Sequence, residues 1–127
     1  MIKLHQGRTV CIDVDDTLIL WEPGKFPNHS PADLITIEDH HQCFNFLPHY
    51  RHIEFIRKLK LQGYGIIVWS RAGGQWASKV VEKLGLEDVV DLTVGKPEFV
   101  LDDLKTQKEI IGSILYIHPD TGEFERN

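Results

Sequence analysis

The chain has 127 residues, of which 42% are hydrophobic and 26% are charged, a composition typical of one soluble globular domain. We therefore expect a single domain over residues 1–127 and exclude a second catalytic domain. Its 14 Lys and Arg residues against 19 Asp and Glu residues give a net charge of −5. This acidic balance argues against a protein whose main work is to grip nucleic acid through a basic surface.

Residues 1–62 predict a strand, an irregular segment and a helix. Residues 9–12 are apolar and β-branched, which is typical of a buried strand in a parallel sheet. Residues 20–48 contain Pro and Gly at many positions, so we expect an irregular flap with room for one short helix or hairpin. Residues 49–62 place apolar side chains at helical spacing among basic ones, which predicts an amphipathic helix that ends at Gly63.

The second half of the chain alternates apolar runs with helical patterns. Such alternation predicts an α/β fold with a central, mainly parallel sheet and right-handed crossovers. The expected elements are a strand at 65–69, a helix at 75–84, apolar strands at 89–94 and 99–101, a short helix at 105–111 and a last strand at 114–117, followed by a polar tail.

The two cysteines indicate a reducing environment. Cys11 and Cys43 form neither a disulfide framework nor a zinc-ligand pattern, so we expect a cytoplasmic protein. Cys11 lies within an apolar run, where a free cysteine is expected to pack as a small hydrophobic side chain. No apolar run reaches the roughly 18 residues needed to cross a bilayer, so we expect no membrane partner.

Polar side chains gather where the predicted strands end. Asp13 and Asp15 follow the first strand, Ser70 follows the second, and Asp102 and Asp103 follow the run at 99–101. Ligands of open parallel sheets bind beyond the carboxyl ends of the strands. Carboxylates this close together repel one another, and Mg²⁺ relieves that conflict because it prefers carboxylate oxygens and water.

A metal ion with several carboxylates at a sheet edge is suited to phosphoryl chemistry. One Asp can act as the nucleophile and a second as the general acid and base. A hydroxyl group and a cation are then needed to stabilise the phosphoryl oxygens. Ser70 and Lys96 are available for those two tasks.

These residues resemble the motifs of the haloacid dehalogenase-like (HAD) hydrolases. Residues 13–17, Asp-Val-Asp-Asp-Thr, resemble the DxDxT signature that follows the first strand of that family. Ser70 resembles its second motif, Lys96 its third, and the Asp102–Asp103 pair its fourth, all in the family's order. The resemblance implies a three-layer Rossmann-like fold. It also implies a small phosphatase without a large cap domain, because the intervals between the motifs are too short for one.

The resemblance also implies roles for these residues. Asp13 would be the nucleophile that becomes phosphorylated, and Asp15 would act as general acid and base. An Asp at this second position marks the family's phosphatases and phosphomutases. Mg²⁺ would be held by the Asp13 carboxylate, the Asp15 backbone carbonyl and an acid of the 102–103 pair. Ser70 would bind the phosphoryl group, and Lys96 would neutralise its charge.

The position of Lys96 departs from the family's usual pattern. It lies only six residues before Asp102, whereas many members place this lysine further upstream. If residues 99–101 form a parallel strand, Lys96 enters at the far end of that strand, and a loop excursion is needed to bring it back. Arg71 is therefore the reserve candidate for the cation.

The substrate class and two other functions stay open. The phosphorylated substrate could be a sugar phosphate, a nucleotide or a phosphorylated macromolecule end, and a homo-oligomer is compatible with the open site. A phospho-accepting, receiver-like signalling domain has a similar length and a similar acidic cluster, although its motifs occur in a different order. A catalytically inactive HAD-like binding protein is the third reading, and the intact Asp13 and Asp15 argue against it.

Several side chains near the motifs are expected to play supporting roles. Asp16 is expected to cap the turn, and Thr17 to form hydrogen bonds within the loop. Trp21 and Trp76 each follow a motif segment, which makes one of them a candidate for the substrate mouth. The remaining expectation is that the histidines are exposed loop residues rather than metal ligands: His29, His40, His41, His49 and His52.

Overall fold

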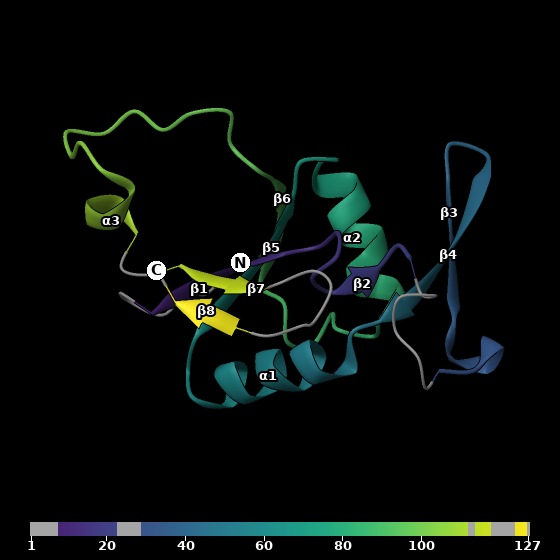
Figure 1. Ribbon diagram of the computed structural model, residues 1–127. Helices are drawn as coiled ribbons and strands as arrows, with labels where there is room; N and C mark the ends of the chain where they lie inside the picture. Colours follow the sequence, from purple (N-terminus) through teal and green to yellow (C-terminus); the bar gives the residue numbers. More distant parts are fainter. Residues whose placement is uncertain (1–7, 23–28, 112–113, 118–123, 127) are drawn as a thin grey trace. The chain divides into compact units, whose positions relative to one another are not determined.

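The computed structural model describes residues 8–22, 29–111, 114–117 and 124–126 (Figure 1). The fold is mixed α/β and the chain divides into two compact units, residues 1–96 and 97–127. No helix in the described part of the chain is long and apolar enough to cross a membrane.

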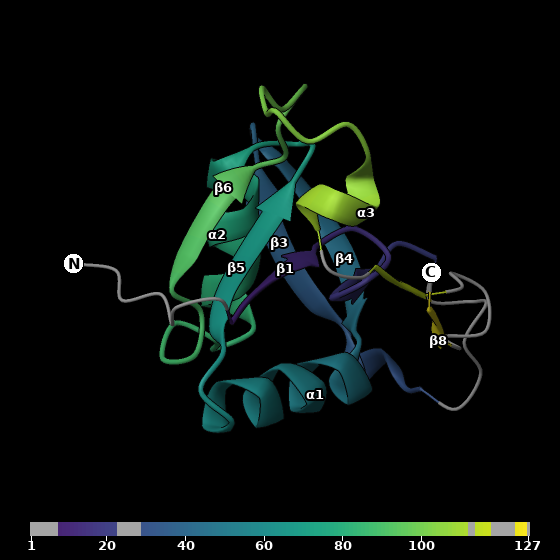
Figure 2. The ribbon, with the colours of Figure 1, turned by 90° about the vertical axis from the view of Figure 1, so that its left-hand side faces the viewer.

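The first unit contains a three-stranded parallel sheet, in which β6, β5 and β1 lie next to one another in Figure 2. The register pairs Asp13 with Trp69 and Ser70 with Gly95, so the three strands end at one edge of the sheet. This arrangement confirms the predicted parallel sheet and its first two strands. In spatial order the strands are β1 (Thr9–Asp13), β5 (Gly65–Ser70) and β6 (Leu92–Gly95).

Two helices precede and follow β5. Helix α1 (Tyr50–Leu61) ends before Gly63, whose positive φ of 94° suits glycine, and α2 (Gly74–Lys83) joins β5 to β6. Both predicted helices are confirmed to within a residue or two. Their inner faces share one apolar core with the sheet, because apolar positions recur at helical spacing. The core includes Ile56, Ile66, Val68, Ala77 and Val80.

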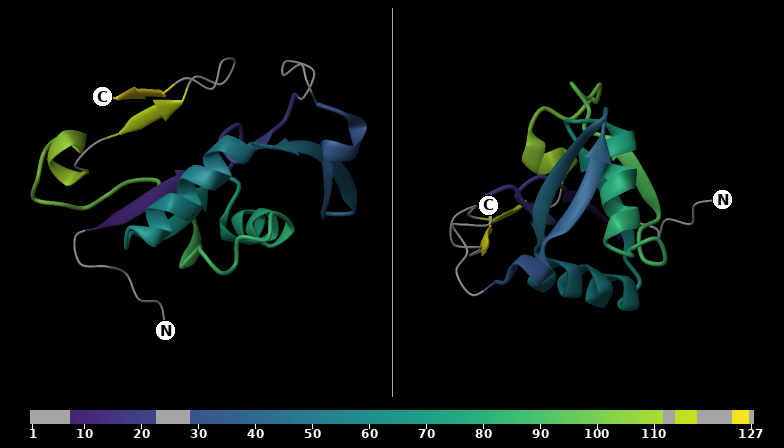
Figure 3. Two further views of the ribbon diagram at one scale, coloured as in Figure 1. Left: turned by 90° about the horizontal axis from the view of Figure 1, so that it is seen from below. Right: turned by 90° about the vertical axis from the view of Figure 1, so that its right-hand side faces the viewer.

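The segment predicted to be an irregular flap contains regular structure. Strand β2 (Ile19–Leu20) pairs with β4 (Gln42–Pro48), which in turn forms an antiparallel hairpin with β3 (Ile35–Asp39). The hairpin turns at His40 and His41, both with positive φ, as a two-residue turn with the twist of a hairpin requires. A short 3₁₀ helix, η2, precedes β3 at Pro31–Asp33. The hairpin runs alongside α2 (Figure 3).

Strand β1 lies at an edge of the parallel sheet, so it is less buried than its apolar sequence predicts. Its side chains alternate, with Val10 and Ile12 packed against the core and Cys11 exposed. The prediction that Cys11 is a buried hydrophobic side chain is therefore wrong. An apolar run reveals a strand, but it does not reveal whether both faces of that strand are covered.

The second unit contains helix α3 (Gln107–Ile110) and an antiparallel pair, β7 (Leu115–Ile117) with β8 (Phe124–Arg126). Helix α3 begins with a capping box, in which Thr106 and Glu109 each bond the other's backbone N–H. The predicted strand at 99–101 is wrong, because these residues form no strand and their side chains are exposed, Leu101 at 96%. An apolar run becomes a strand only where a partner strand supplies hydrogen bonds.

Candidate active site

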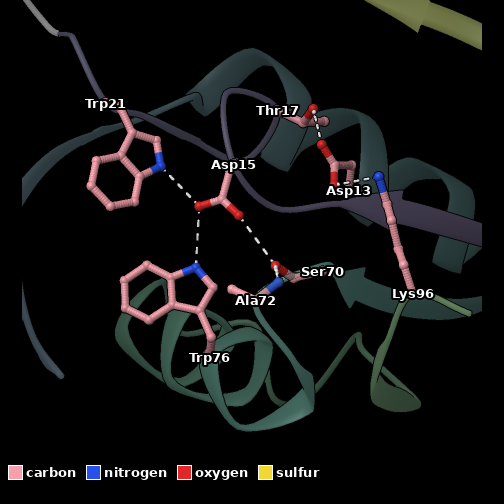
Figure 4. A network of polar contacts seen from close by, with 8 residues as sticks. All are labelled: Asp13, Asp15, Thr17, Trp21, Ser70, Ala72, Trp76 and Lys96. Carbon is pink, nitrogen blue, oxygen red and sulfur yellow. Dashed lines mark hydrogen bonds and ion pairs between the residues drawn. The ribbon is translucent and has the colours of Figure 1, made fainter. Parts of the chain in front are cut away.

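Three polar side chains meet at the carboxyl edge of the parallel sheet. Asp13 ends β1, Ser70 ends β5 and Lys96 follows β6 directly. Asp15 lies two residues beyond Asp13, in the loop that leaves the sheet. Figure 4 shows these four residues as two neighbouring pairs, Asp13 with Lys96 and Asp15 with Ser70, and the contact within each pair is dashed. The structure therefore brings together four of the six site residues that the sequence predicts.

The Asp13 carboxylate lies between a cation and a hydroxyl group. The Lys96 ammonium group is 3.0 Å from Oδ1 of Asp13, and the Thr17 hydroxyl donates to Oδ2 at 3.2 Å. The Asp13 side chain is 35% exposed, so it remains accessible from solvent. An oriented and accessible carboxylate beside a cation can attack an electrophilic centre, and the cation can stabilise the negative charge on that centre.

The Asp15 carboxylate is held by three donors. The indole N–H groups of Trp21 and Trp76 donate to Oδ1 at 2.8 Å and 3.2 Å, and the Ser70 hydroxyl donates to Oδ2 at 3.1 Å (Figure 4). Ser70 is fully buried, and its hydroxyl oxygen accepts the backbone N–H of Ala72 at 3.1 Å. These bonds fix the orientation of Asp15, as a group that transfers protons in a defined direction requires.

The loop carrying both carboxylates is anchored in the core. Val14 and Leu18 are fully buried, and the Val14 carbonyl accepts the N–H groups of the next turn, including that of Leu18 at 2.8 Å. Asp16 has a φ of 59°, a conformation that Asp tolerates better than most residues. Its carboxylate accepts the Trp21 backbone N–H at 3.2 Å, which supports the expected turn-capping role.

Lys96 reaches the site without the loop excursion that the sequence suggested. Lys96 directly follows β6, so it emerges at the same edge of the sheet as Ser70. The excursion was expected only if residues 99–101, which come after Lys96, formed the strand. Its backbone N–H donates to the Ser70 carbonyl at 3.0 Å, which continues the sheet pairing by one residue. The close approach of β6 to the start of α2 depends on glycine, since a Cβ on Gly74 would lie 3.3 Å from the Val94 Cα.

Asp102 and Asp103 belong to the second unit and are described within that unit alone. Within that unit the Asp102 carboxylate accepts the Leu104 backbone N–H at 2.8 Å. Among the residues that the structure describes, no group of three or more His, Cys, Asp or Glu side chains could hold a metal ion. Of the predicted site residues, the first unit supplies two carboxylates, Asp13 and Asp15, which are hard oxygen ligands suited to Mg²⁺.

The sequence did not reveal the contacts of the tryptophans or of two histidines. Both Trp21 and Trp76 donate to Asp15, whereas the sequence made one of them a candidate for the substrate mouth only. His52 is buried on the inner side of α1, where its ring forms a 2.6 Å hydrogen bond with the Thr17 carbonyl. His49 stacks on His52 with ring centroids 3.3 Å apart. The expectation of exposed loop histidines is wrong for His49 and His52. Their spacing of three residues at the start of α1 turns both toward the loop of residues 14–18, which carries Asp15.

The histidine pair predicts acid sensitivity. Burial and the neighbouring His52 lower the pKa of His49 to about 4, and burial also lowers the pKa of His52. An unfolded chain takes up protons on both rings below about pH 6.5, where the folded chain resists them. The stability that comes from keeping these rings neutral should therefore be fully present above about pH 6.5. As the pH drops toward 4, the free energy of unfolding should fall.

This pH dependence is measurable by urea unfolding between pH 7 and pH 4.5. The double variant His49→Gln/His52→Gln should flatten the pH dependence in this window, whereas His41→Gln, in the exposed hairpin turn, should leave it unchanged. An equal slope in the wild type and the double variant would contradict the assignment.

A hollow of about 420 Å³ opens beside Asp15. It is lined by Asp15, Asp16, Trp21, Asp39, Phe44, Ala72 and Trp76. A larger hollow of about 830 Å³ lies between α1, the end of α2 and the hairpin, and none of the candidate site residues lines it.

No protein-family model matches the sequence, and comparisons with curated proteins and with solved structures found no match.

Proposed function

We propose that the chain is a Mg²⁺-dependent phosphatase of HAD-like architecture, which hydrolyses a phosphomonoester through an aspartyl-phosphate on Asp13. The observation that carries this proposal is the pairing of an accessible Asp13 with the Lys96 ammonium group at 3.0 Å, beside an Asp15 held by three donors. A nucleophile, a cation and an oriented proton carrier are the three parts that a two-step phosphoryl transfer needs.

In the first step, a carboxylate oxygen of Asp13 attacks phosphorus in line with the leaving group. The bond from Asp13 to phosphorus forms as the bond from phosphorus to the ester oxygen breaks, and Asp15 gives that oxygen its proton. In the second step, the Asp15 carboxylate takes a proton from water, whose oxygen bonds to phosphorus as the bond from phosphorus to Asp13 breaks. This step releases phosphate and regenerates Asp13. Lys96 stabilises the negative charge on the phosphoryl oxygens throughout.

We assign Ser70 as a phosphate-binding group, as the resemblance implies; its hydroxyl donates to Asp15 at 3.1 Å in this structure and would exchange that acceptor for a phosphoryl oxygen. Mg²⁺ would be held by the Asp13 carboxylate, the Asp15 carbonyl and an acid of the Asp102–Asp103 pair, as the resemblance implies. When bound, such an ion neutralises charge on the phosphoryl group and on the carboxylates.

The test of the proposed function is hydrolysis of a panel of phosphomonoesters by the full chain, with and without Mg²⁺. We expect turnover that disappears with a chelator and returns with added Mg²⁺. No turnover with any ester at any Mg²⁺ concentration would overturn the proposal. A stable phosphorylated protein formed from a small phosphodonor, without release of phosphate, would favour the receiver-like alternative instead.

The acidic pair of the second unit is tested by a metal titration. The double variant Asp102→Asn/Asp103→Asn should require at least about tenfold more Mg²⁺ for half-maximal turnover, because it removes a charged ligand. A matched control is Glu87→Gln/Asp88→Asn, which removes two adjacent exposed acids. An unchanged Mg²⁺ requirement in the 102–103 variant would exclude the pair as metal ligands.

A further inference from the structure

The hollow beside Asp15 has aromatic walls that the proposed chemistry does not use. Trp21, Phe44 and Trp76 come from three separate segments and contact one another, with ring centroids 5.6 Å apart for Trp21 and Phe44 and 6.5 Å for Phe44 and Trp76. Phe46 lies behind them, fully buried, with its ring 4.6 Å from that of Trp21. The walls are therefore supported from within by the core.

The hydrogen bonds of the two indoles determine what they can offer a ligand. Both indole N–H groups donate to Asp15, so they are already engaged and only the ring surfaces remain for a ligand. Trp76 is 6% exposed, whereas Trp21 is 41% exposed and Phe44 is partly exposed. Trp21 and Phe44 thus provide an apolar surface in the same hollow as Asp15, the proposed proton carrier.

Apart from Ala72, the rest of the lining is acidic. Asp16 and Asp39 line the hollow together with Asp15. The Lys79 ammonium group, 2.7 Å from Asp39, holds the pKa of that carboxyl below its usual range, so Asp39 stays ionised at neutral pH. Among the described residues, three carboxylates against the one cation, Lys79, leave this hollow with a net negative charge, which disfavours a second phosphate or a carboxylate.

We infer that this hollow is the leaving-group subsite of the proposed phosphatase and that it takes a planar, unsaturated ring carrying no negative charge. The inference rests on the proposed function, because the leaving group must lie next to Asp15 to receive its proton. The volume of about 420 Å³ falls within the usual range of small-molecule sites. Flat rings gain most from such walls because they stack on aromatic side chains.

Two substrates that differ only in ring shape test the subsite. Benzyl phosphate and cyclohexylmethyl phosphate both release a primary alcohol, so their leaving groups are similar and only one carries a flat ring. We expect kcat/KM to favour benzyl phosphate by at least about fivefold. We also expect 4-carboxybenzyl phosphate to be a poorer substrate than benzyl phosphate.

Phe44→Leu is the diagnostic variant, because it removes the flat ring while keeping an apolar side chain of similar size. It should bring the benzyl-to-cyclohexylmethyl ratio of kcat/KM close to one, whereas Leu61→Ala, at a residue 88% exposed on α1, should leave the ratio unchanged. A wild-type ratio near one, or an unchanged ratio in Phe44→Leu, would overturn the subsite even if both esters are hydrolysed.

Binding of the non-hydrolysable benzylphosphonate and cyclohexylmethylphosphonate, measured by calorimetry, separates the subsite from the proposed function. If neither ester is hydrolysed but benzylphosphonate binds more tightly in a Phe44-dependent way, the subsite stands and the phosphatase proposal fails. Equal binding of the two phosphonates overturns the subsite.

Discussion

Replacing Asp13 with asparagine should abolish phosphomonoester hydrolysis, lowering kcat by roughly 10⁴-fold or more, as loss of a catalytic nucleophile does elsewhere. The amide has neither the negative charge nor the nucleophilic oxygen that the first step requires. It also leaves the Lys96 ammonium group without its 3.0 Å partner. The measurement is steady-state turnover of benzyl phosphate, together with acid quenching to detect phosphate bound covalently to the wild-type chain.

Asp88→Asn is the matched control for this substitution. The Asp88 side chain is 72% exposed and forms a surface ion pair with Arg57 at 3.6 Å, so we expect little change in kcat. Wild-type turnover in Asp13→Asn, or covalent phosphate retained in that variant, would exclude Asp13 as the nucleophile.

Leu18→Ala should lower the free energy of unfolding of the first unit by about 3 kcal/mol, within the range for buried leucines. Leu18 is fully buried at the end of the loop that carries Asp15. Its carbonyl accepts the N–H of His49 at 2.8 Å. Truncation leaves a cavity at the point where the loop joins the core. The change is measured by urea unfolding, followed by tryptophan fluorescence, because all three tryptophans belong to the first unit.

Leu61→Ala makes the same chemical change at a position that is 88% exposed. We expect its free energy of unfolding to stay within about 0.5 kcal/mol of the wild type, as is usual for surface substitutions. Equal losses in the two variants would contradict the burial of Leu18.

Local patterns in the sequence were sufficient for most of the first unit. The apolar runs before Asp13 and before Ser70 predicted β1 and β5, and helical spacing predicted α1 and α2. These predictions succeed because alternation of strand and helix leaves few arrangements of a parallel sheet. The same reasoning placed Asp13 and Ser70 at one sheet edge, where the structure has them.

Long-range pairing is where the sequence reasoning failed. Residues 99–101 have the apolar composition of a strand, but they form none, whereas the strand predicted at 89–94 is found as β6 at Leu92–Gly95, where it pairs with β5. Whether a run becomes a strand depends on a partner that can be distant in the chain, and local composition carries little information about that partner.

The sequence by itself determined which chemical groups follow the first two strands and in what order, because each group is bonded directly to the end of an apolar run. Only the tertiary structure decided the partners of those groups. Strand β6 carries Lys96 to Asp13, and packing of the hairpin and α2 on the core brings Trp21 and Trp76 to Asp15. These contacts join residues from separate elements, so they depend on how the core packs rather than on any local pattern.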